Sequence, residues 1–396
     1  MRISIIGAGI GGLTAGLSLL RQGFEVEILE QAGKLGEIGA GIQISPNGVR
    51  VLAALGLQDD ILAHASESAG KRIRLWSTGQ EWKLFDLGAL SRQRYGFPYL
   101  TMHRSDLHQT LVNAVRALQP NAIRLGIRVD DLRQEDGLVR VFSSGQEVAT
   151  ADFVIGADGV HSQVRRCLFG DDKPRFSGIV AWRGIIDAEN LPAHLRQPYA
   201  YNWVGSGKHV IHYPMRGGKL INLVAAVERT QDWGIESWSQ QGTRQDFQSD
   251  FAGWHEDVHH LIRAVEIPYK WALMIRDPMA AWTKGQVTLL GDACHPTLPF
   301  LAQGAVMALE DGYLLARALK ESHGDVAKAT AAYENARIER TTKIVQGANE
   351  NATRFHNPQL AHAEGATAYV DHEWNEERVK QRYEWLFEYN AETLTL

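Results

Sequence analysis

The chain has 396 residues, of which 44% are hydrophobic and 22% charged, so it can bury one large core or two smaller ones. Its formal net charge of −5 comes from interspersed acids and bases without a basic stripe, which argues against nucleic acid as a partner. Cys167 and Cys294 lie far apart and match no metal-ligand spacing. We therefore expect a reducing, cytoplasmic location and no bound metal.

The N-terminal segment predicts a βαβ unit rather than a targeting sequence. Residues 2–6 form an isoleucine-rich strand, a helical pattern runs from 12 to 22, and a second strand covers 25–30. The first twenty residues contain five glycines and no cleavage signal, and no later stretch reaches the ~18 apolar residues of a membrane span. We expect the opening of a doubly wound α/β domain and no membrane span.

The remaining elements suggest a second layer inserted into this domain. Strand-like runs at 153–155 and 286–290 each end in a Gly/Asp turn, as parallel strands do at their ligand-facing ends. Between them, residues 179–187, 208–213 and 219–227 alternate or carry β-branched side chains between glycine-rich turns, which is typical of antiparallel strands. From about residue 309 the pattern is helical to the end of the chain.

A glycine motif lies between the first strand and the first helix. In Gly7-x-Gly9-x-x-Gly12, the first glycine permits a tight turn, the second lets the backbone approach a pyrophosphate, and the third allows close packing of the helix on the strand. Glu30 ends the next strand and can accept hydrogen bonds from a ribose. The motif predicts a dinucleotide with an unphosphorylated ribose, which fits FAD or NAD better than NADP.

Further motifs connect the chain to a known family. The sequence GADG occupies 156–159, GDACHP occupies 291–296, and HRSDL occupies 103–107. With the glycine motif, this set resembles the single-component flavoprotein aromatic hydroxylases over residues 3 to about 340. The resemblance implies that Asp158 lies near FAD and the nicotinamide cofactor, that Asp292 holds the ribityl chain, that Arg104 reaches FAD, and that the backbone at Val129 meets the adenine.

The resemblance also implies a division of the chain. A Rossmann-like FAD-binding domain covers 1–70, 100–175 and 275–340, an antiparallel substrate layer covers 71–99 and 176–274, and a helical C-terminal segment covers 341–396. In the segment 36–43 the same resemblance assigns Ala40 and Gly41 to cofactor binding. The aromatic residues of the C-terminal segment are expected to pack on the domain or on the second copy of a homodimer.

Residues 296–305 form a proline-rich loop before a helix that starts near residue 306. Its two prolines favour an extended approach, and Gly304 and Ala305 leave backbone N–H groups free at the helix N-terminus. These groups are expected to stabilise negative charge on the N1–C2=O edge of reduced flavin. Gln303 is a candidate hydrogen-bond partner for the substrate's hydroxyl or carboxylate.

His212 is the candidate base, because the resemblance places its strand over the flavin ring and a histidine can accept a phenolic proton at neutral pH. Tyr213 is a second candidate, with core packing as its alternative role. The segments 36–43, 182–184, 212–214 and 299–303 resemble the salicylate and 3-hydroxybenzoate hydroxylase branch.

The resemblance implies a monooxygenase in which NADH or NADPH reduces FAD, O2 adds at flavin C4a, and the terminal hydroxyl passes to a small phenolic acid of the salicylate or 3-hydroxybenzoate type. Two alternatives stay open, a 6-hydroxynicotinate-type heteroaromatic hydroxylase and a flavin dehydrogenase or oxidase that inserts no oxygen. The segment His255-Glu256-Asp257-Val258-His259 fits the zinc motif HExxH. It lacks an evident third ligand, so we expect a solvated helix there and no zinc.

Overall fold

The structure, a computed structural model, describes residues 1–36, 40–230 and 240–396. Its first sheet is parallel apart from one edge strand and has the order β18-β19-β12-β1-β2-β8. The strands are β1 (Arg2–Ile6), β2 (Glu25–Glu30), β8 (Ile123–Leu125), β12 (Phe153–Gly156), β18 (Thr283–Lys284) and β19 (Val287–Leu289). The expected strands at 2–6 and 25–30 are confirmed, and those at 153–155 and 286–290 differ by one residue at their ends.

Helices cover this sheet and complete the doubly wound domain. Helix α1 (Ile10–Arg21) contacts α5 (Arg104–Leu118) on one side and α9 (Gly304–Glu321) on the other. The inner face of α1 is almost entirely buried, and Leu13 and Leu17 join the isoleucines of β1 in a common core. Smaller helices are α2 (Pro46–Ala54), α3 (Gln58–His64) and α6 (Gln163–Phe169).

The second large sheet is the inserted layer that the sequence predicts. It has the order β17-β13-β16-β15-β14-β5-β6, and all its neighbours are antiparallel except β14 and β5. The strands are β5 (Gly70–Leu75), β6 (Glu81–Asp86), β13 (Arg175–Asp187), β14 (Tyr199–Gly205), β15 (Lys208–Met215), β16 (Leu220–Glu228) and β17 (Tyr269–Ile275). Helices α4 (Ala89–Tyr95), α7 (Arg244–Asp250) and α8 (Glu256–Ala264) flank it.

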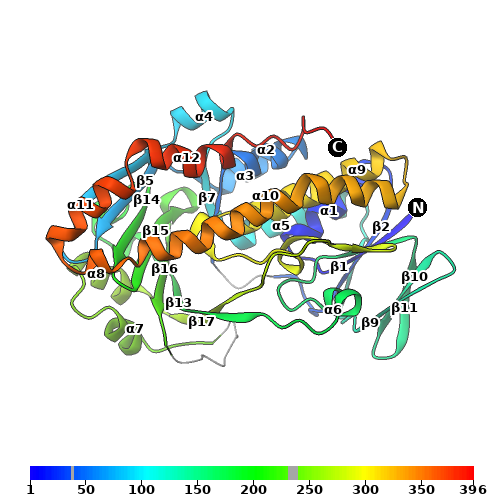
Figure 1. Ribbon diagram of the computed structural model, residues 1–396, viewed down its shortest axis with the longest axis horizontal. Helices are drawn as coiled ribbons and strands as arrows, with labels where there is room; N and C mark the ends of the chain where they lie inside the picture. Colours follow the sequence, from blue (N-terminus) through cyan, green and yellow to red (C-terminus); the bar gives the residue numbers. More distant parts are fainter. Residues whose placement is uncertain (37–39, 231–239) are drawn as a thin grey trace.

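Two small sheets adjoin the large ones. The first, with the order β3-β7-β4, consists of β3 (Gly41–Ile44), β7 (Leu100–His103) and β4 (Ser66–Glu67), and β7 contacts β15 of the second large sheet. The other has the order β11-β10-β9 and projects as a flap near α6 in Figure 1, with bounds β9 (Asp131–Glu135), β10 (Leu138–Ser143) and β11 (Gln146–Ala151). The α/β fold with an inserted antiparallel layer is therefore confirmed.

Helix α10 (Val326–Phe355) extends along the molecule from the first sheet to the second (Figure 1). The boundary expected after residue 340 falls inside this uninterrupted helix, and the division of the chain into domains stays a prediction. Helices α11 (Ala363–Glu373) and α12 (Glu376–Phe387) follow. The aromatic tail packs on its own chain, where Phe387 contacts the rings of Tyr95 and Tyr99. No helix of the described part of the chain is long and apolar enough to cross a membrane.

Candidate active site

A cavity of about 360 Å³ lies between the two large sheets, a volume typical of small-molecule sites. One part is lined by residues of the glycine turn and of the loops after β12 and β19, and another by residues of β13, β15, β16 and β17. Of the expected site residues, those that line it are Gly9, Ala40, Gly41, Arg104, Tyr213, Asp292, Gly304 and Ala305.

The three glycines of the first motif have different roles in the structure. Gly7 has φ +105°, and a Cβ on Gly12 would lie 2.0 Å from the Gly7 carbonyl oxygen, so both glycines are required by the turn itself. A Cβ on Gly9 would meet nothing within 4 Å, although Gly9 lines the cavity at the N-terminus of α1. This open space beside a helix N-terminus suits a phosphate group.

Glu30 lies beside this turn, and neither Glu30 nor Val129 lines the cavity. The Glu30 carboxylate accepts hydrogen bonds from the backbone N–H groups of Ala8 and Ala32, both at 2.8 Å, which fixes it against the glycine turn. The Ile127 N–H donates to the Glu30 carbonyl at 2.9 Å, so the strand end that leads to Val129 runs alongside. Their expected contacts with ribose and adenine remain predictions.

Asp158 orders the loop after β12 rather than lining the cavity. Its carboxylate accepts hydrogen bonds from the Ser162 hydroxyl and from the N–H groups of Gln163 and Val164 at the start of α6. Burial raises the pKa of Asp158, and these hydrogen bonds partly oppose that rise. The carboxylate holds the turn at Gly159, with φ +77°, whose backbone does line the cavity.

Asp292 is open to the cavity although it lies well inside the molecule. Its side chain is exposed to the cavity. Burial within the molecule raises the pKa of Asp292, although the charges of His295 and Arg104 act to lower it. Gly291 before it has φ +62°, and its N–H donates to Asp311 at 3.0 Å. The loop thus presents one carboxylate to the cavity while the backbone is anchored behind it.

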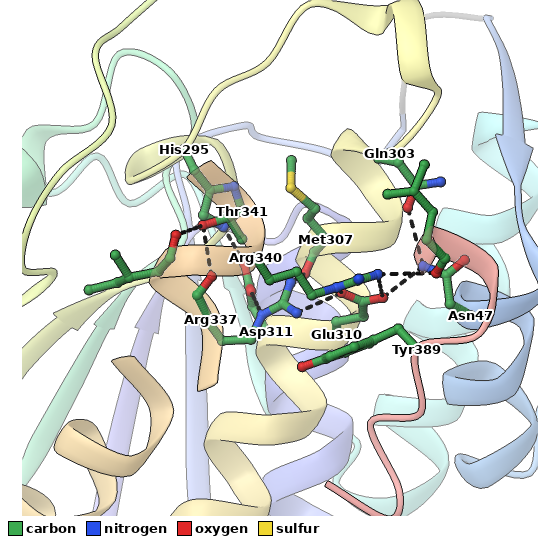
Figure 2. A network of polar contacts seen from close by, with 12 residues as sticks. Asn47, His295, Gln303, Met307, Glu310, Asp311, Arg337, Arg340, Thr341 and Tyr389 are labelled. Atoms are coloured by element: carbon green, nitrogen blue, oxygen red, sulfur yellow. Dashed lines mark hydrogen bonds and ion pairs between the residues drawn. The ribbon is translucent and has the colours of Figure 1, made fainter. Parts of the chain in front are cut away.

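A buried ionic network anchors this loop and the start of α9 (Figure 2). Glu310 and Asp311 of α9 are fully buried; Arg337 of α10 pairs with both, and Arg340 pairs with Glu310. Asp311 also bonds His295 Nε2 at 2.6 Å. Burial alone would raise the pKa of Asp311, but His295 and Arg337 outweigh it and lower the pKa to about 2. The network joins α9 and α10 beneath the cavity.

Gln303 belongs to this network and does not line the cavity, contrary to the expectation of a substrate contact. Its amide nitrogen donates to the Ser45 hydroxyl at 2.9 Å. Its amide oxygen accepts from Asn47 Nδ2 at 3.2 Å (Figure 2). Asn47 also donates to Glu310 at 2.7 Å. Gln303 is 1% exposed, so its side chain positions the start of α9 against α2.

The alternation of side chains along strand β15 determines which of its histidines lines the cavity. His209, Ile211 and Tyr213 alternate along the strand and line it, whereas His212 lies on the opposite face and stacks on Tyr201, with ring centroids 4.9 Å apart. Neither ring nitrogen of His212 has a hydrogen-bond partner in the described residues, and burial, with the nearby charge of Arg74, lowers its pKa to about 3. The structure therefore does not bring His212 into the site. The histidine of β15 that lines the cavity is His209, which the sequence did not indicate and which lies four residues before Tyr213 on the same face of the strand.

Tyr213 lies where the first and second domains meet. A Cβ on Gly41 would approach the Tyr213 hydroxyl to 2.7 Å, and the Gly41 N–H donates to Asn222 Oδ1 at 2.7 Å. Burial raises the pKa of Tyr213 well above its usual range, so its hydroxyl keeps its proton. The carbonyl of Ala40 accepts a hydrogen bond from the Arg104 N–H at 2.9 Å, which connects the segment to α5. Residues 37–39 of the quoted segment 36–43 lie outside the described residues.

The segment with the zinc-like spacing is part of α8 and its cap. His255 precedes the helix as its N-cap, with Nδ1 accepting from the Asp257 N–H, and its ring stacks on Trp203 at 5.3 Å. Within residues 1–36, 40–230 and 240–396, no group of three or more His, Cys, Asp or Glu side chains is arranged to hold a metal ion.

Comparisons with known proteins identify the family. Residues 1–348 match the family model described as "FAD binding domain". The chain belongs to the FAD-dependent aromatic hydroxylases. It is 38% identical to a 3-amino-4-hydroxybenzoate 2-monooxygenase of Streptomyces platensis over 90% of this chain and 89% of the relative. It is 35% identical to a 3-hydroxybenzoate 6-hydroxylase of Polaromonas naphthalenivorans over 98% and 96%.

A solved structure agrees with this assignment. Klebsiella pneumoniae HpxO complexed with FAD and uric acid superposes with a TM-score of 0.83 at 26% identity, covering 96% of each chain. The FAD-dependent monooxygenase class expected from the sequence is therefore confirmed, and FAD is the cofactor of the family. The open space at Gly9 and the carboxylate of Asp292 in the same cavity are consistent with that cofactor.

Proposed function

We propose that this protein hydroxylates a small phenolic acid of the hydroxybenzoate type, with NADH or NADPH as electron donor and O2 as oxidant. The observation that carries the proposal is that a single cavity connects a dinucleotide turn at Gly9 with a histidine and a tyrosine on an apolar sheet face. Relatives that act on 3-hydroxybenzoate and on 3-amino-4-hydroxybenzoate support the substrate class.

Residues of the first part of the cavity would hold FAD. Gly9 leaves room for the pyrophosphate at the N-terminus of α1, and Asp292 offers an acceptor for ribityl hydroxyls. The N-terminal N–H groups of α9, at Gly304 and Ala305, would favour negative charge on the flavin ring. When bound, FAD supplies electron transfer from the nicotinamide and activation of O2.

The second part of the cavity suits an anionic aromatic ring. Val224, Leu273 and Phe300 provide apolar and aromatic walls against which a ring can pack. Arg104 and Arg183 also line the cavity and make its interior attractive to a carboxylate. The walls keep water from the reacting ring, which protects the activated oxygen from wasteful release.

His209 replaces His212 as the proposed base. Burial lowers the pKa of His209 well below its usual value, so its imidazole is neutral at neutral pH and has a lone pair to accept a proton. A phenol that has given up its proton is a stronger nucleophile toward electrophilic oxygen. Tyr213, whose hydroxyl stays protonated, would donate a hydrogen bond to the substrate and orient it.

The test is NADH and NADPH oxidation with purified, FAD-loaded protein and a panel of 3-hydroxybenzoate, salicylate, 3-amino-4-hydroxybenzoate and 6-hydroxynicotinate. We expect at least one hydroxybenzoate to stimulate O2-dependent oxidation and to yield a product with one added oxygen from ¹⁸O2. Stimulation by 6-hydroxynicotinate alone would favour a heteroaromatic substrate. Oxidation of NAD(P)H without ¹⁸O in any product would refute oxygen insertion.

A further inference from the structure

A chain of hydrogen bonds leads from the cavity wall to the protein surface. His209 Nδ1 lies 2.6 Å from His356 Nε2, and His356 Nδ1 lies 2.9 Å from Glu228 Oε1. The side chains of His209 and His356 are almost fully buried, whereas that of Glu228 is 54% exposed. The three residues therefore connect a residue of the cavity wall to solvent without a gap.

Backbone hydrogen bonds hold this chain in place. The residues come from the start of β15, the end of β16 and the C-terminal end of α10. The turn between β14 and β15 joins them, because the Gly207 N–H donates to the His356 carbonyl at 3.0 Å and the Glu228 N–H donates to the Gly207 carbonyl at 2.9 Å. Two aromatic rings pack against the buried His209, since the ring centroids of Phe300 and Phe355 lie 4.8 Å and 5.4 Å from that of His209.

The hydrogen-bond chemistry gives the chain a direction. An ionised Glu228 can only accept, so His356 donates from Nδ1 and, when neutral, accepts at Nε2. His209 then donates from Nδ1 to His356, which leaves its lone pair on Nε2. His209 Nε2 is buried at the cavity wall and has no partner in the described part of the chain, so a substrate must displace neighbouring atoms to reach it. The outer carboxylate thus selects the tautomer in which the cavity-lining histidine is a base at Nε2.

The members of this chain influence one another. Among the described residues, the pKa of His209 is lowered first by burial and then by the charge of His356, and the hydrogen bond from His356 lowers the pKa of Glu228. A lowered pKa keeps Glu228 ionised at neutral pH, as the assigned direction requires.

We propose that His356 and Glu228 are positioning residues that fix the His209 tautomer and form the route by which the phenolic proton leaves the site. This inference rests on the proposed hydroxylase function of the same cavity. The substrate O–H proton moves to His209 Nε2, the Nδ1 proton of His209 moves to His356 Nε2, and the Nδ1 proton of His356 moves to Glu228 and solvent. After the ring is hydroxylated and regains aromaticity, the reverse transfers return one proton to the phenolate product and restore both tautomers.

The kinetic test compares Glu228→Gln and His356→Gln with Glu228→Asp. Glutamine can still accept a hydrogen bond but cannot carry the proton onward, whereas aspartate keeps the carboxylate. Glu350→Gln is the matched control, because Glu350 is an exposed carboxylate near the same end of α10 that bonds Arg354 instead of a histidine. FAD content and far-UV circular dichroism verify that each variant is folded.

The probe is 3-hydroxy-4-nitrobenzoate, whose phenolate absorbs visible light, mixed with the oxidised holoenzyme in a stopped-flow instrument. We expect both glutamine variants to slow formation of the bound phenolate by about 100-fold. The aspartate variant should recover most of the rate, and Glu350→Gln should match the wild type. Wild-type rates in both glutamine variants would overturn the relay while leaving the hydroxylase proposal intact.

A second measurement does not depend on the substrate. In holoenzyme with ¹⁵N-labelled histidine, NMR should show His209 protonated at Nδ1 and unprotonated at Nε2. Substitution of Glu228 by Gln should increase the population of the opposite tautomer. A wild-type His209 that carries its proton on Nε2 would overturn the inference, whether or not any hydroxybenzoate proves to be a substrate.

Discussion

Replacing Asp292 by Asn should affect FAD binding and apoprotein stability in opposite directions. The carboxylate is enclosed in the cavity, and its pKa is raised by burial, so the folded apoprotein disfavours its charge. Because a raised carboxyl pKa costs stability at pH values above the unfolded pKa, removing the charge at pH 7 should leave the apoprotein Tm unchanged or higher.

FAD binding should weaken in the same variant. A hydrogen bond to a charged acceptor contributes about 1.5–3 kcal/mol. The Asn amide oxygen still accepts a hydrogen bond, which contributes about 0.5–1.5 kcal/mol, so about 1–1.5 kcal/mol is lost. That loss corresponds to a roughly 5- to 13-fold rise in the Kd for FAD. The assay is titration of apoprotein with FAD, followed by quenching of flavin fluorescence, with thermal unfolding measured on the same apoprotein.

Asp311→Asn is the matched control, because Asp311 is also buried beside His295 but is paired with Arg337. Breaking such a buried pair costs about 3–5 kcal/mol, so this variant should lower the apoprotein Tm. A destabilised Asp292→Asn apoprotein that binds FAD as tightly as the wild type would refute the assignment of Asp292 to the cofactor.

Three further outcomes are expected. Gly9→Ala should fold normally but lose FAD, because its Cβ would occupy the open space expected to hold the pyrophosphate. Gly12→Ala should fail to fold, because its Cβ would lie 2.0 Å from a carbonyl oxygen. Circular dichroism and flavin content distinguish the two variants, and a folded Gly12→Ala would contradict the packing argument. His209→Ala should lower the hydroxylation rate by about 100-fold, whereas His212→Ala should retain coupled hydroxylation. Equal losses of hydroxylation rate in the two variants would contradict the assignment of His209, and not His212, to the cavity face of β15. The free energy of unfolding should fall as the pH drops from about 4 toward 2, because the pKa of Asp311 is lowered to about 2 and its protonation breaks its ion pairs. If acid unfolding of Asp311→Asn follows the same pH curve as that of the wild type, this explanation is contradicted.

Local sequence determined the cofactor-binding half of the protein. The turn at Gly7 and Gly12 is dictated by backbone conformation and close packing within one βαβ unit, so its signature is visible in adjacent residues. Parallel strands end at a common edge, and for that reason the order of motifs along the chain is enough to assign Asp292 and the α9 N-terminus to the same site.

The substrate half depended on tertiary structure. Strand β15 is buried on both faces, so its sequence shows no alternation between polar and apolar residues, and nothing local indicates whether His209 or His212 faces the cavity. Pairing with β14 and β16 sets that choice. Likewise, Gln303 is recruited by Ser45 and Asn47, more than 250 residues earlier in the chain.

The sequence alone could not predict that His356 and Glu228 lie beside His209. His356 is 147 residues from His209 and is the C-cap of α10, a helix whose periodicity does not indicate which distant residue its end will contact. Local periodicity determines which elements form and which edge of a parallel sheet carries the ligand. The register of buried strands and the contacts of a long helix arise from packing of the whole chain, and only the folded structure decides them.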